Sequence, residues 1–178
     1  MKAITLYNPH AMLMAIGAKM IETRPRKWSY VGPVAIHAGL HRGWCHLAKT
    51  EPFKSALSEA GLMFMNEMAE GAVVAIGNMV GCVESEYFTH AKEGSDLVSY
   101  GGGSLKLPHP FSDRERAFGN YEPGRFCYVF DQIRRLSEPV PAKGNRGMWD
   151  WIPPAGLTIE PFTWNGPQFI RYEGLKAA

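Results

Sequence analysis

Strand-like segments follow one another along most of this chain, and helices are inserted at only a few points between them. The segments with strand character are residues 3–7, 19–24, 32–38, 71–83, 125–136 and 147–151. Helical patterns occur at residues 9–16, 41–49, 53–68 and 112–118. Few strand–helix–strand units and no glycine-rich phosphate loop argue against a doubly wound parallel sheet. This order of elements predicts an α+β fold with a barrel-like sheet.

Composition limits the kind of partner that the chain binds. Its 178 residues suit a single domain, and 46% apolar with 20% charged residues is ordinary for a globular protein. The net charge is only +2. We therefore expect any contact with nucleic acid to come from a local patch rather than from the charge of the whole chain.

The cysteines and the N-terminus indicate a cytoplasmic protein. Cys45, Cys82 and Cys127 are odd in number, and no two of them form a CxxC pair, so a disulfide framework is not expected. The first seven residues are too short and too polar for a secretory signal. No apolar run approaches the ~20 residues that span a bilayer, so no membrane contact is predicted.

Three charges lie within six residues on the second predicted strand. Gly17 suits the left-handed end of the preceding helix, and Lys19, Glu22 and Arg24 follow it. Side chains alternate along a strand, so Glu22 and Arg24 share a face and can pair, while Lys19 and Thr23 share the other. We interpret the stretch as one wall of a ligand site. The alternative is an ion-pair ladder on an edge strand.

A basic and aromatic turn comes next, with Arg26, Lys27 and Trp28 in succession. Cations beside an aromatic ring are typical of proteins that bind single-stranded nucleic acid, because the cations hold phosphates and the ring stacks on bases. The alternative is a solvated turn whose Trp anchors the core.

The spacing of several histidines and a cysteine resembles that of a metal site, but the predicted elements argue against one. His37, His41 and Cys45 are each four residues apart, with His46 adjacent. His37 ends a predicted strand, however, and glycines interrupt the segment, so the three cannot share a helix face. We predict no metal and no cofactor. His37 lies opposite the apolar face of its strand, so it either lines a cleft or is a satisfied core histidine.

Two regions lack clear periodicity. Residues 84–120 contain three consecutive glycines and two prolines, and they predict a long loop with one short helix near residues 112–118. Residues 152–178 predict an extension packed on the domain formed by residues 1–151.

Five landmarks in order resemble the ASCH domains common in phages and bacteria, which are related to PUA and EVE/YTH domains. The landmarks are Gly17-x-Lys19-x-x-Glu22-x-Arg24, Ala35-Ile36-His37-Ala38, Gly71-Ala72-Val73-Val74-Ala75-Ile76, Pro123-Gly124-Arg125-Phe126 with Tyr128-Val129-Phe130, and Gly147-Met148-Trp149-Asp150-Trp151. The resemblance covers about residues 2–151.

This resemblance implies a PUA-like pseudobarrel, mixed but mostly antiparallel, with helices packed alongside and a cleft at its side. It also implies binding of RNA or a modified nucleoside. Some small members resemble amidohydrolases acting on modified cytidine, and Lys19 matches their strand Lys. The Thr expected three residues later is Glu22 here, Thr23 is one place late, and residues 75–78 of the central strand carry no Glu.

The sequence therefore predicts a module that recognises RNA or a modified nucleotide in a basic and aromatic cleft. Its predicted lining is Lys19, Glu22, Arg24, Arg26, Trp28, His37 and Trp149. Two alternatives stay open. One is a hydrolase of modified nucleosides or RNA, with Lys19 as base and Glu22 or Thr23 assisting. The other is a protein-interaction module. The sequence leaves the oligomeric state open.

Overall fold

The computed structural model describes residues 1–62, 65–100, 103–157 and 168–170. The elements in chain order are β1 (Lys2–Leu6), α1 (His10–Ala15), β2 (Ile21–Arg24), β3 (Gly32–Ala38), η1 (Cys45–Lys49), α2 (Phe53–Glu59), η2 (Met65–Glu67), β4 (Ala72–Glu84), α3 (Glu86–Thr89), β5 (Leu97–Tyr100), β6 (Gly103–Lys106), α4 (Asp113–Ala117), β7 (Phe126–Pro141), β8 (Met148–Asp150) and β9 (Gln168–Ile170).

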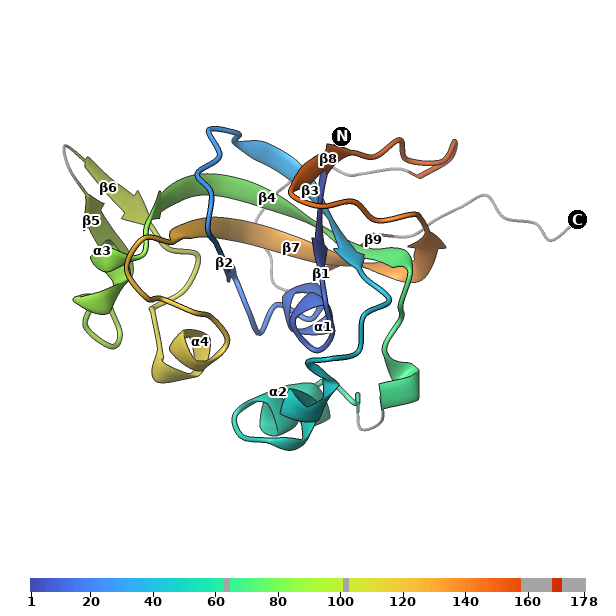
Figure 1. Cartoon of the computed structure of the whole chain (residues 1–178), viewed down its shortest axis with the longest axis horizontal. Coiled ribbons are helices and arrows are strands. Elements are labelled where there is room, and N and C mark those ends of the chain that lie inside the picture. The colour runs from blue at the N-terminus through green and yellow to red at the C-terminus, as the bar shows by residue number, and fades with distance from the viewer. Residues whose placement is uncertain (63–64, 101–102, 158–167, 171–178) are drawn as a thin grey trace, which may run out of the picture. The chain divides into compact units, whose positions relative to one another are not determined.

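One sheet contains most of the strands, in the order β2-β7-β4-β3-β1-β8, and β9 also pairs with β7 (Figure 1). β2 pairs antiparallel with β7, and β1 pairs antiparallel with β8 and parallel with β3. The predicted fold class is confirmed. The protein is α+β, with a curled, mostly antiparallel half-barrel sheet and a few helices, consistent with the PUA-like fold that the ASCH resemblance implies.

The chain divides into two compact units, and the long strands β4 and β7 contribute residues to both. Unit 1 consists of Met1–Ala18, Pro33–Gly77 and Gln132–Ala178, and unit 2 of Lys19–Gly32 and Asn78–Asp131. Unit 1 has a core cluster that includes Ala3, Val73 and Trp151. Every residue of α1 after His10 is buried. Gly17 follows this helix with φ +75°, the left-handed conformation that the sequence predicts.

Unit 2 has its own core cluster, which much of the predicted long loop builds. Phe88, Val98 and Phe111 are almost fully buried in this cluster. Residues 84–120 contain α3, the β5–β6 hairpin and the predicted short helix, α4. The segment is thus largely ordered by apolar side chains that are scattered along it and give no periodic pattern.

Two further elements end at residues other than those expected. The helix predicted at residues 53–68 ends at Glu59, and Gly61 follows with φ +75°. β7 continues five residues beyond the predicted end, to Pro141. Of the predicted extension, residues 158–167 and 171–178 lie outside the described residues. None of the helices in the described parts of the chain has the length and apolar character needed to cross a membrane.

Candidate functional site

Lys19 is a fully buried cation two residues before the start of β2, in unit 2. Its side chain is 0% exposed. The ammonium group donates to the backbone carbonyl of Ile21 and, over 3.0 Å, to the carbonyl of Phe118 at the end of α4. An ammonium group has three donors, and the third points toward the carboxylate of Glu22 on β2.

Glu22 joins the buried Lys19 to the partly exposed Arg24. One carboxylate oxygen lies 3.6 Å from the Lys19 Nζ, and the other lies 2.8 Å from the Arg24 Nε. The exposed fractions of the side chains rise from 0% at Lys19 through 12% at Glu22 to 29% at Arg24. The predicted Glu22–Arg24 pair is therefore present. It fixes an arginine at the surface of unit 2.

A second buried carboxylate, Glu115 of α4, also serves β2. It is 1% exposed. Its two oxygens accept from the backbone N–H groups of Met20 over 2.9 Å and Ile21 over 3.2 Å. Burial raises the pKa of the Glu115 carboxyl, and the charge of Lys19 and the two backbone donors act against that rise. His109 lies 3.9 Å from the same carboxylate.

β2 is the last strand in the sheet order and pairs with β7. Side chains form hydrogen bonds with backbone groups on the side of β2 that does not pair with β7. Ile21 donates its N–H to Glu115 and accepts at its carbonyl from Lys19. The Thr23 carbonyl accepts from the Arg125 guanidinium over 3.1 Å. The Thr23 hydroxyl accepts from the Asn120 N–H over 3.0 Å. The carbonyl and the hydroxyl of Thr23 are thus engaged inside unit 2.

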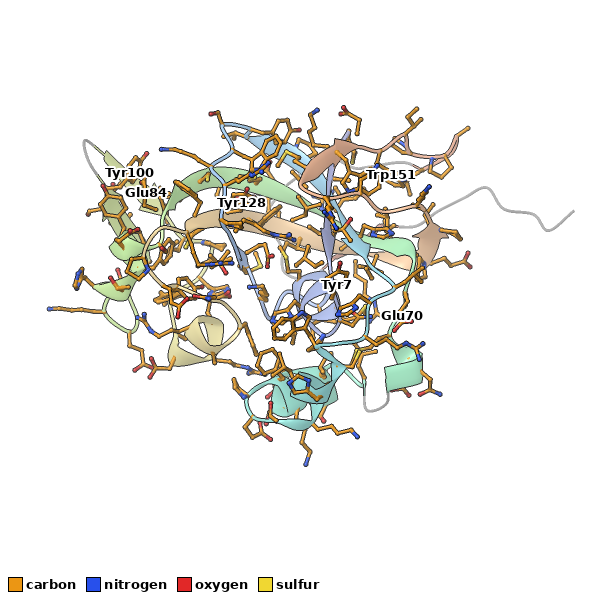
Figure 2. All side chains as sticks on the ribbon, in the orientation of Figure 1. Tyr7, Glu70, Glu84, Tyr100, Tyr128 and Trp151 are labelled. Carbon is orange, nitrogen blue, oxygen red and sulfur yellow. The ribbon has the colours of Figure 1, made fainter. Side chains whose placement is uncertain are left out.

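The turn after β2 presents the predicted basic and aromatic residues. Arg26 is exposed and Trp28 is half-buried. The Tyr128 hydroxyl on β7 donates to the Arg26 carbonyl over 2.7 Å and is hydrogen-bonded to the Trp28 side chain (Figure 2). Lys27 pairs with Glu84 over 3.1 Å. Tyr128 therefore holds both ends of this three-residue turn.

His37 and Trp149 lie together in unit 1. Their rings meet edge to face with centroids 5.8 Å apart. The His37 Nε2 lies 2.9 Å from the Ala142 carbonyl, and the Trp149 indole donates to the Thr5 hydroxyl over 3.1 Å. His37 is 2% exposed, and burial lowers the pKa of its imidazole. These contacts are internal to unit 1.

The other residues of the histidine and cysteine motif have separate partners. His41 contacts the Tyr7 ring, His46 lies 3.1 Å from the Gly43 carbonyl, and Cys45 contacts the Asn8 carbonyl. Across the described ranges, no group of three or more His, Cys, Asp or Glu side chains could hold a metal ion.

Sequence reasoning predicted the Glu22–Arg24 pair, but it placed Lys19 on the other face of the strand and missed Glu115. One signal was available, because Ser112-x-x-Glu115 has the spacing of a capping box. In the structure the Ser112 hydroxyl does accept from the Glu115 N–H over 3.1 Å. The Glu115 side chain, however, reaches across to β2. Nothing local in the sequence marks that long-range contact.

Comparisons with known proteins give likenesses among solved structures. No protein-family model matches the chain, and no curated protein does. A solved structure of a mutant ZmASCH protein from Zymomonas mobilis is similar over 78% of this chain and 73% of that chain, with 13% identity and a TM-score of 0.39. A likeness at this level leaves the function of this chain to be argued from its own residues.

Proposed function

We propose that the chain binds RNA or a modified nucleotide through a surface of unit 2 formed by Arg24, Arg26 and Trp28. The observation that carries this proposal is the Glu22 bridge, which connects the buried Lys19 to the partly exposed Arg24. Long arginine side chains lose conformational freedom when they bind. An arginine held in advance by a carboxylate that is itself paired with a buried lysine loses less.

The residue types of this surface suit a nucleotide. The planar guanidinium of an arginine such as Arg24 can hold a phosphate with two parallel hydrogen bonds. Arg26, two residues further along the chain, is exposed. A half-buried Trp28 leaves part of its ring to stack on a base. His37 and Trp149, whose contacts are internal to unit 1, have no part in this proposal.

The contacts of Lys19 favour binding over catalysis. A general base needs a free lone pair, but the Lys19 ammonium donates to two carbonyls and lies beside Glu22. The buried cysteine of unit 2 is no better nucleophile, because burial raises the pKa of Cys127 to about 12. The hydrolase prediction thus gains no support from the surroundings of these groups.

RNA affinity of single variants tests the proposal. Arg24→Ala and Arg26→Ala should each weaken binding of an oligoribonucleotide or a modified nucleotide about tenfold or more, because each removes a charged contact. Glu22→Gln should weaken it as well by releasing Arg24. The matched control is Lys92→Ala, which removes an exposed cation elsewhere in unit 2. Unchanged affinity in all three test variants would overturn the proposal.

A further inference from the structure

Unit 1 exposes a group of large apolar side chains in and beside the loop of residues 39–46. Leu40 is 73% exposed, Trp44 is 50% exposed and Tyr7, at the end of β1, is 42% exposed. Burying a tryptophan or tyrosine ring contributes much to binding energy, and contiguous exposed patches mark interaction sites. Nothing described above gives this surface a role.

Each exposed ring is paired with a histidine ring. Tyr7 and His41 have centroids 4.9 Å apart at 60°, and Trp44 and His46 have centroids 6.4 Å apart at 32°. We refer to these four side chains as the platform. Histidine rings stack on unpaired bases as tyrosine and tryptophan rings do.

The backbone under the platform is ordered. Cys45 donates to the Arg42 carbonyl over 3.1 Å, and Leu47 donates to the Trp44 carbonyl over 3.0 Å. The Tyr7 ring lies so close to Gly39 that a Cβ there would come within 2.8 Å of it. The rings are therefore presented on a fixed loop and need little ordering when they bind.

Local charge favours a polyanion over a basic or neutral partner. Residues 39–50 contain Arg42, Lys49 and two histidines and no Asp or Glu. Glu70 holds Arg42 through contacts of 2.8–3.0 Å (Figure 2), and the Arg42 side chain as a whole is 75% exposed.

A second exposed aromatic group has the opposite charge. Tyr87 and Tyr100 of unit 2 are 36% and 38% exposed, with centroids 6.3 Å apart. Their segment, residues 84–100, has four acidic residues and one lysine. Apolar exposure is similar in the two groups, but only the platform lies on a segment that suits phosphates.

We propose that the platform stacks on bases of single-stranded RNA, with Trp44 as its main contact. The proposal rests on the proposed function for the class of its ligand, but it uses different residues in the other unit. It implies that the ligand is a polynucleotide, because the rings of the platform contact bases and not a single charged group.

Binding of poly(U) at several salt concentrations tests the inference in the full chain. Trp44→Ala should weaken binding about five- to hundredfold, the range for one lost stacked base. It should leave the salt dependence unchanged, whereas Arg26→Ala should reduce that dependence. Trp44→Phe should retain most of the affinity. Tyr100→Ala, the matched exposed ring on an acidic segment, should bind as the wild type does.

The two proposals fail separately. Wild-type affinity in Trp44→Ala with weaker binding in Arg26→Ala would overturn the platform and leave the proposed function standing. Weaker binding in Trp44→Ala with wild-type affinity in Arg24→Ala, Arg26→Ala and Glu22→Gln would overturn the proposed surface of unit 2 and leave the platform standing. Equal losses in Trp44→Ala and Tyr100→Ala, or a protein bound through Trp44 in place of RNA, would also overturn the platform. If Trp44→Ala lowers the Tm, Tyr7→Leu gives the same comparison by removing the other ring.

Discussion

Lys19 and Glu115 are buried ionisable side chains, and backbone groups hydrogen-bond to each of them. A buried charge without partners costs several kcal/mol, which explains why each has at least two polar partners. Lys19 donates to the carbonyls of Ile21 and Phe118, and Glu115 accepts from Met20 and Ile21. The same contacts tie β2 to α4. At the scale of single residues, these two side chains are therefore part of the structure that supports the proposed surface.

Glu115→Ala should lower the free energy of unfolding by about 3–5 kcal/mol, because it leaves two backbone donors without their buried partner and removes the carboxyl group near the buried Lys19. Urea denaturation measures this change. Asp113→Ala on the same helix is the control, since that side chain is 77% exposed and should cost little. Similar losses in the two variants would contradict the assigned role of Glu115.

His37 should make stability depend on pH. Burial lowers its pKa in the folded state from the ordinary value of 6.5, so the unfolded chain takes up a proton more readily than the folded one. This contribution is present above pH 6.5 and is lost as the pH falls below it.

The urea midpoint should therefore decrease between pH 7.5 and 5.5, and less so in His37→Gln. His46→Gln, which changes an exposed histidine of the same unit, should keep the wild-type decrease. An equal decrease in His37→Gln and wild type would assign the effect to other groups.

The stability of the short helix α4 in unit 2 depends on its N-terminal cap. α4 has only five residues, and its N-terminal cap is the Ser112 hydroxyl bonded to the Glu115 N–H. A helix this short has little stability of its own. The cap also fixes the residue whose carboxylate holds β2.

Ser112→Ala should cost about 0.5–2 kcal/mol of unfolding free energy, the usual range for a lost cap. Ser112→Asp keeps an acceptor at the same place and should retain most of the stability. Chemical denaturation of both variants checks this. Equal stability of Ser112→Ala and wild type would show that the cap contributes nothing.

Elements with a regular pattern could be predicted from the sequence, and those without one could not. The strands at residues 32–38 and 71–83 have continuous apolar runs, and both are present as β3 and β4 with nearly the expected bounds. The β5–β6 hairpin was missed because its strands have four residues each and only Val98 is buried on the first. The role of Glu115 was missed because a contact across 94 residues leaves no local trace.

The small net charge of the whole chain predicts that RNA binding depends only weakly on salt concentration. With a net charge of only +2, binding must rely on a few local cations. If Arg24 and Arg26 each contact one phosphate, the slope of log K against log salt concentration should be about −1 to −2. A titration series at constant pH measures it. A much steeper slope would mean that many more cations take part than the proposed surface contains.

The outward groups of β2 have a consequence for self-association. An unprotected edge strand invites pairing with a strand of another molecule, which leads to aggregation or domain swapping. Here Lys19, Glu115 and Arg125 already occupy the Ile21 and Thr23 backbone groups described above. A foreign strand could add at β2 only after displacing charged side chains, two of them buried. Lys19, which also supports the Glu22–Arg24 pair, thus helps to protect this edge of the sheet from pairing with a second copy of the chain.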